Sequence, residues 1–164
     1  MPAAAEERWE ARPIEDRDAK LKVVAAMFAA FARFDHDEFA RHLTEDVEFR
    51  PSAFLTGKGE FHGREEVREN LRELAGQLDE SGEAIRLHPV AFYLDRRDES
   101  KVLALGNLKI IRESGESFGT EVAYLHTMRG DKVAALRTWL DHKEGLSQLA
   151  SPEEVTLPGA GPGS

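Results

Sequence analysis

The chain has 164 residues, of which 41% are apolar and 32% charged, and this favours one folded domain over two domains or a disordered chain. The formal net charge of −9 argues against a nucleic-acid partner, because phosphate binding requires clustered Lys and Arg. The absence of Cys excludes disulfides, thiol catalysis and cysteine-based zinc sites. The longest apolar run, residues 23–32, is too short to cross a bilayer, and the first residues lack the pattern of a signal peptide. We therefore expect a cytoplasmic protein without a membrane partner.

The first half of the chain has the pattern of helices. Apolar residues recur at helical spacing over residues 17–34, which predicts a long and largely buried helix. Asp35, followed three residues later by Glu38, has the pattern of an N-cap and predicts a short second helix. A third helix is predicted to follow Gly63 and to end near Gly82.

The rest of the folded part has the pattern of strands. Turns containing Gly, or Asp with Gly, separate the last three strands and predict consecutive antiparallel hairpins. Helices followed by a strand meander predict an α+β fold, with the helices on one face of a curved antiparallel sheet. Residues 1–15 are predicted to be an N-terminal arm, 16–149 the domain and 150–164 a disordered C-terminal tail. The predicted strands are 47–51, 85–94, 102–111, 118–128 and 133–142.

Two segments carry a resemblance to a known family. These are GEFHGREEVRENL at residues 59–71 and the stretch 122–141, which contains the turn MRGDKV and ends in LRTWLD. Together they resemble the SnoaL-like polyketide-cyclase group of the NTF2-like superfamily, over roughly residues 17–149. The resemblance implies a cone-shaped αα-β-α-ββββ fold around one small-molecule pocket. It also implies a homodimer through the outer face of the sheet, which here carries Leu125 and Trp139.

The residues that line this pocket follow from the alternation of side chains along strands. We assign the even-numbered positions of the last two strands to the concave face, although a one-residue bulge would exchange the faces. That set is Thr120, Val122, Tyr124, His126 and Met128, with Ala134, Leu136, Thr138, Leu140 and His142. The predicted ligand contacts are Met27, Phe54, Val122, Leu136, Thr138 and Leu140.

Three side chains are candidates for catalysis in the pocket. Arg50 could hold a carboxylate or enolate oxygen, Tyr124 could donate to a carbonyl, and His126 is the natural base because its solution pKa is near neutral. The resemblance aligns the steroid-isomerase catalytic positions with Arg50, Tyr124 and Met27, and the cyclase pair with Tyr124 and Thr138. None of these positions keeps the required residue, so neither chemistry transfers to this chain. The alternative is that the buried polar groups are only hydrogen-bonded to backbone or water.

No metal or cofactor is expected. No two of the six His have the i, i+4 spacing of a helical zinc pair, and the run from Asp35 to Asp37 is better explained as an acidic helix start. No Gly-rich phosphate loop is present. The apolar loop at residues 51–61 could cover the pocket mouth or pack on a neighbouring subunit, and both alternatives stay open.

Three functions compete on these grounds. The first is a binding module that holds a small hydrophobic molecule in the central cavity without changing it. The second is a cofactor-free acid/base enzyme, a lyase, isomerase or hydrolase, that acts on a polyketide-, terpenoid- or steroid-like substrate through His126 with Arg50 and Tyr124. The third is a dimeric assembly domain whose cavity is incidental. The binding module ranks slightly first because the family's catalytic positions are changed.

Overall fold

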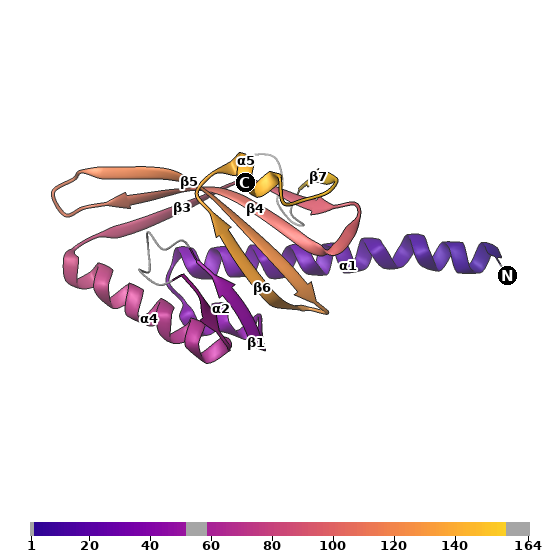
Figure 1. The fold of residues 1–164 in the computed structure, drawn as a ribbon, viewed down its shortest axis with the longest axis horizontal. Coiled ribbons are helices and arrows are strands. Elements are labelled where there is room, and N and C mark those ends of the chain that lie inside the picture. The colour runs from indigo at the N-terminus through magenta and orange to yellow at the C-terminus, as the bar shows by residue number, and fades with distance from the viewer. Residues whose placement is uncertain (1, 52–58, 157–164) are drawn as a thin grey trace.

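The computed structural model describes the backbone of residues 2–51 and 59–156, and within these ranges the side chains from Arg17 onwards. It confirms the α+β class and the order of helices before a strand meander (Figure 1). The elements are α1 (Pro2–Ala32), α2 (His36–Arg41), β1 (Leu43–Arg50), β2 (Phe61–His62), α4 (Arg64–Ser81), β3 (Ala84–Asp95), β4 (Asp98–Ile111), β5 (Ser117–Arg129), β6 (Lys132–Trp139), α5 (His142–Leu146) and β7 (Pro152–Val155).

Local capping sets the boundaries of the helices. The Asp35 carboxylate accepts a hydrogen bond from the backbone N–H of Glu38 at 3.1 Å, which confirms the predicted N-cap of α2. Gly82 ends α4 with φ of +70°, a left-handed conformation that costs Gly little. Phe34 also has a positive φ, +54°, and turns the chain sharply between α1 and α2.

Helix α1 is longer than predicted. It begins at Pro2, so helix replaces the arm expected over residues 1–15, and its N-terminal part extends past the sheet in Figure 1. Neither α1 nor any other helix that the structure describes is both long and apolar enough to cross a membrane.

One curved sheet organises the molecule, with the strand order β2-β1-β6-β5-β4-β3-β7. The pairs are antiparallel except for β1 and β6, which run parallel. Helices α1, α2 and α4 lie on one side of this sheet and α5 on the other (Figure 1). The antiparallel hairpins predicted for the last three long strands are therefore confirmed.

Each face of the sheet carries its own apolar cluster. The larger cluster fills the space between the helices and the concave face. The smaller one lies on the outer face and consists of Leu103, Leu105, Ala123, Leu125 and Leu149, with half-buried Tyr93, Trp139 and Leu146 packed against it. Since β4 and β5 supply residues to both clusters, their side chains alternate between the two faces along each strand.

Residues 141–155, here called the C-terminal strap, cover the outer cluster. The predicted tail begins at residue 150, but residues 152–155 form β7, which pairs with β3. Leu125 is only 5% exposed beneath the strap, so it is not available to a partner subunit while the strap is in place. The prediction missed this arrangement because the strap is mostly polar and has no clear period.

Candidate functional site

A small cavity of about 20 Å³ lies between α1 and the concave face of the sheet. A volume of this size has room for about one water molecule, whereas pockets for drug-sized ligands measure roughly 300–1,000 Å³. The cavity is lined by Met27, Phe28, Phe31, Phe39, Phe49, Leu87, Tyr124, His126 and Leu136.

Aromatic rings form much of the cavity wall. The ring of Phe28 meets that of Tyr124 edge to face, with centroids 6.0 Å apart, and Phe31 lies 6.2 Å from the same ring. Phe28 packs directly on Gly106, where a Cβ atom would come within 2.8 Å of the Phe28 Cζ. Glycine at this point of β4 therefore lets α1 approach the sheet closely.

Two hydroxyl groups on this face have no hydrogen-bond partner. Tyr124 on β5 and Thr138 on β6 are directly paired across the two strands. Their Oη and Oγ1 atoms are both buried and make no hydrogen bond within the described part of the chain. A buried hydroxyl in this condition costs roughly 1–3 kcal/mol. Burial raises the pKa of Tyr124, so its hydroxyl stays protonated and is able to donate.

His126 is a neutral, fixed side chain. It is 3% exposed, and its Nδ1 lies 3.1 Å from the carbonyl oxygen of Val102, which requires the tautomer with a proton on Nδ1. Burial lowers the pKa of His126 to about 4, although hydrogen bonds to the backbone of Val102 and Tyr124 oppose that shift. A base with this pKa is weak at neutral pH, where the best catalytic bases have a pKa close to the operating pH.

Comparison with known proteins gives the family. The model described as the SnoaL-like domain matches residues 24–136, more than half of the chain. The chain belongs to the SnoaL-like domain family. Proteins of this family bind ligands and are often dimeric. A search of curated proteins found no significant match.

Solved structures share the fold of this SnoaL-like domain at low identity. An NTF2-like protein of unknown function from Burkholderia pseudomallei is 19% identical with a TM-score of 0.60, over 81% of this chain and 98% of that chain. TerC, crystallised with polyporic acid, is 19% identical with a TM-score of 0.61, over 80% and 97%. An LEH-like epoxide hydrolase from M. tuberculosis is 16% identical with a TM-score of 0.60, over 82% and 86%. At these identities the likeness shows the NTF2-like fold alone.

The SnoaL-like domain brings several of the predicted site residues together. Met27, Tyr124, His126 and Leu136 line the cavity, and Thr138 lies opposite Tyr124. Val122 is fully buried in the same cluster without lining the cavity.

Other predicted site residues lie elsewhere. Arg50 faces away from the cavity, because its neighbour Phe49 faces in; its side chain is 53% exposed, with Nε 3.5 Å from a carboxylate oxygen of Glu60. Leu140 follows the end of β6 and is 37% exposed. Phe54 lies outside the described residues.

A bulge also changes the expected register of β6. The pairing shifts between Thr127 and Met128, so that Met128 lies opposite Val133. Val133, rather than the predicted Ala134, therefore joins the main apolar cluster.

The aromatic wall was the part of the site that the sequence prediction missed. Phe28 and Phe31 stand on the apolar stripe of α1, and Phe49 follows from alternation along β1, so the signals were present. What was missing was the curvature of the sheet, which decides how deeply these rings fill the cone. The missed lining residues are Phe28, Phe31, Phe39, Phe49 and Leu87.

The site offers no ligand set for a metal. In the described ranges, no three His, Asp or Glu side chains converge in the way a metal ion requires. His126 and Tyr124 are the titratable groups that line the cavity.

Proposed function

We propose that this SnoaL-like domain binds a small, mainly apolar molecule between α1 and the concave face of the sheet, and holds one polar atom of it with Tyr124 and Thr138. The pair of buried, unpartnered hydroxyls carries this proposal. Each costs free energy in the unliganded protein, and a ligand oxygen between them would accept from one and donate to the other. Ligand binding would then supply the hydrogen bonds that these two hydroxyls lack in the folded protein.

The aromatic wall supports a flat aromatic or polycyclic ligand with a hydroxyl or carbonyl group. Phe28, Phe31 and Tyr124 offer both ring faces and ring edges to such a molecule. The cavity of about 20 Å³ is too small for it as it stands, so binding requires rotation of Phe28 or Phe31 or a shift of α1 away from the sheet.

Binding without turnover is favoured over catalysis by two features of the site. Arg50, expected to hold a carboxylate or enolate oxygen, pairs with Glu60 outside the cavity. His126 is neutral and hydrogen-bonded to the Val102 carbonyl, and burial lowers its pKa to about 4. An acid/base enzyme remains the second candidate, because His126 and Tyr124 share one cavity.

The test is binding of two probes, 2-naphthol and polyporic acid, to the full chain by isothermal calorimetry and thermal shift. Probe at a hundred times its Kd should stabilise the protein by about 2.7 kcal/mol. Tyr124→Phe and Thr138→Val should each weaken binding about tenfold, since each removes one hydrogen bond. Tyr93→Phe is the matched control, because Tyr93 is the other tyrosine and packs on the outer cluster.

Each remaining outcome counts against a stated part of the proposal. Equal affinity of Tyr124→Phe and Tyr93→Phe would place the ligand outside this cavity. No binding of either probe would contradict the proposed ligand class. Mass spectrometry tests whether a bound probe is converted. Conversion that is lost in His126→Gln would show that the protein is an acid/base enzyme and not a binding module.

A further inference from the structure

An open groove of about 630 Å³ lies between the C-terminal end of α4 and the hairpin of β4 and β5. In Figure 1 the turn of this hairpin and the end of α4 lie at the same end of the molecule. The volume of the groove falls within the roughly 300–1,000 Å³ of small-molecule pockets. The interior cavity that Tyr124 lines measures only about 20 Å³, so the groove is the larger space by far.

Apolar side chains supply part of the lining of the groove. Leu74 and Leu78 come from α4, and Ile110 comes from β4. Phe118 on β5 is paired with Ile110 across the hairpin and is 52% exposed, so this wall presents apolar surface to solvent. Apolar surface that is exposed within a concave site is typical of ligand binding.

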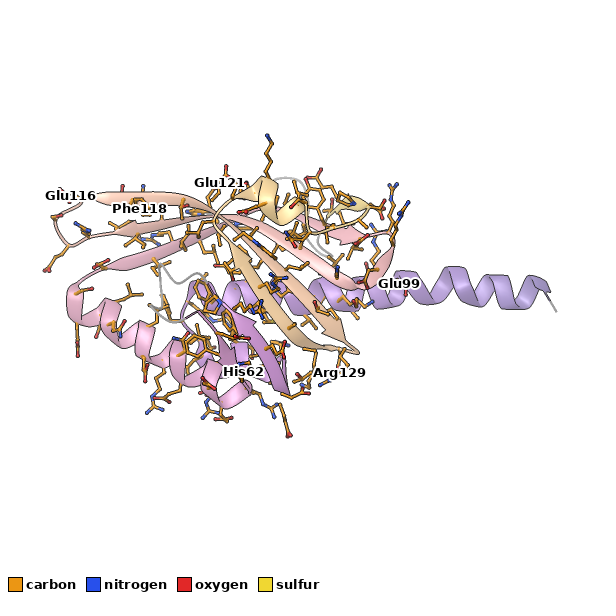
Figure 2. All side chains as sticks on the ribbon, in the orientation of Figure 1. His62, Glu99, Glu116, Phe118, Glu121 and Arg129 are labelled. Atoms are coloured by element: carbon orange, nitrogen blue, oxygen red, sulfur yellow. The ribbon has the colours of Figure 1, made fainter. Side chains whose placement is uncertain are left out.

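The charged residues of the groove are mostly acidic. Glu83 lies between α4 and β3, and Glu116 lies in the turn of the hairpin, where Figure 2 labels it. Among the described residues that line the groove, Arg112 is the only basic one, and its guanidinium lies 3.6 Å from the Glu116 carboxylate. The carboxylate of Glu113 lies against Gly82 at the end of α4. Since Arg112 and Glu116 offset each other, Glu83 and Glu113 leave the surroundings of the groove negative.

The end of α4 adds to this negative potential. A helix C-terminus carries a partial negative charge, which basic residues in the last turn usually offset. The last turn of α4 has no basic residue and contains Asp79 and Glu80 instead. Arg86 and Lys109, which are paired between β3 and β4, face the outer side of the sheet, because their neighbours along each strand belong to the main cluster. The groove therefore combines apolar surface with an excess of negative charge.

We propose that this groove is a second binding site and that its ligand is an apolar amine. The hydrocarbon part lies on Ile110 and Phe118, and the ammonium group faces the carboxylates of Glu83 and Glu116. The ammonium group supplies the positive charge that the end of α4 lacks. A neutral molecule of the same shape would gain only the apolar contacts. The site is independent of the interior cavity and of the ligand proposed for it.

The test compares two probes of similar shape, 1-naphthylmethylamine and 1-naphthylmethanol, by isothermal calorimetry on the full chain at neutral pH. The amine should bind about fivefold more tightly than the alcohol, and added NaCl should reduce this ratio because salt screens exposed charges. Glu83→Gln combined with Glu116→Gln should weaken binding of the amine about fivefold and leave binding of the alcohol unchanged. Arg112→Gln should strengthen binding of the amine, because it removes the competing cation.

Glu65→Gln is the matched control at the other end of α4. The Glu65 side chain is 77% exposed and lies 3.7 Å from Arg68, much as Glu116 is 75% exposed and lies 3.6 Å from Arg112. Equal weakening of the amine by Glu65→Gln would show a general attraction of cations to this acidic protein and would overturn the proposal. So would equal affinity for the amine and the alcohol, or no binding of either probe. Weaker binding of the amine to Tyr124→Phe would place the amine in the interior cavity and contradict a second site.

Discussion

At the residue scale, two buried hydroxyl groups affect both the stability of the protein and its affinity for a ligand. Tyr124 and Thr138 are buried and directly paired, but neither Oη nor Oγ1 finds a hydrogen-bond partner in the described chain. Native proteins leave few groups in this condition, and those they leave often serve function at some cost in stability. Removing such a hydroxyl should therefore raise the stability of the protein and weaken ligand binding.

We expect Tyr124→Phe to raise the free energy of unfolding of the unliganded protein by up to about 1 kcal/mol, because the substitution removes an unsatisfied buried group and keeps the ring. Urea denaturation measures the change, with Tyr93→Phe expected to stay within about 0.5 kcal/mol of the wild type. A loss of more than 1 kcal/mol in Tyr124→Phe would mean that a bound water or another partner already satisfies the hydroxyl.

His126 gives the site a pH dependence whose sign follows from burial. Its pKa of about 4 in the folded protein lies below the unfolded value of about 6.5, so the unfolded state binds the proton first. The contribution of neutral His126 to the free energy of unfolding is therefore fully present above pH 6.5 and is lost as pH falls towards 4. Over that window the loss due to His126 should reach about 3 kcal/mol.

Denaturant titrations of wild type and His126→Gln between pH 7 and pH 4 isolate this contribution, because the carboxyl groups common to both proteins cancel. The wild type should lose about 3 kcal/mol more than the variant. His62→Gln is the matched control for the exchange of His for Gln, because the His62 side chain is 64% exposed and lies on the surface (Figure 2). Parallel curves for wild type and His126→Gln would contradict a lowered pKa of His126.

At the scale of elements, sequence predicts what local chemistry decides. The Asp35 cap, the Gly82 terminator and the hairpins of the last three long strands each follow from a few neighbouring residues. Alternation along β5 also placed Tyr124 and His126 in the cavity. Arg50 was predicted from the alignment with the family's catalytic position, although alternation along β1 puts it opposite Phe49 and outside.

The features that sequence did not predict depend on residues far apart in the chain. The parallel pairing of β1 with β6 joins segments separated by four strands and a helix. The bulge leaves one residue of β6, Ala134, unpaired between the partners of Thr127 and Met128, and the sequence there has no distinctive feature. The strap has only a few apolar anchors, such as Leu146 and Leu149, too few for a periodic signal. The small cavity volume follows from how all of these elements pack together.

Asp95 should hold the end of the strap more strongly than its position at the end of β3 suggests. Its carboxylate is 3% exposed and accepts backbone hydrogen bonds from Arg97, Ala150 and Ser151. Burial acts to raise the pKa of Asp95, but these amide donors outweigh it and the net pKa is lowered. The ionised carboxylate is therefore the form that attaches the strap.

We expect Asp95→Asn to cost about 1–3 kcal/mol, because the side-chain NH₂ group would face a backbone N–H that needs an acceptor. Urea denaturation measures the total loss. Asp131→Asn in the exposed turn between β5 and β6 is the control and should change stability by less than about 0.5 kcal/mol. A neutral Asp95→Asn would show that the strap does not depend on the carboxylate.

For the whole molecule, one sheet supports two apolar clusters of unequal size. The main cluster draws on every long strand and on α1, α2 and α4, whereas the outer cluster depends on the strap for its cover. Strands β4 and β5 contribute to both clusters and should open only when the whole domain unfolds. Most of the strap lies on the outer face, and only Val155 at its end packs into the main cluster. We therefore expect the strap to open locally at a lower free energy than the domain as a whole.

Native-state hydrogen exchange should therefore resolve two levels of stability. Amides of the strap such as Ser147 and Leu149, which bond to Lys143 and Leu146, should exchange through a local opening whose free energy lies below that of global unfolding. Amides paired between β4 and β5 should exchange only with global unfolding. In Asp95→Asn the opening free energy of the strap should fall by about 1–3 kcal/mol, by as much as the carboxylate contributes to attachment. If strap and β5 amides exchange with one common free energy, the strap unfolds only together with the domain.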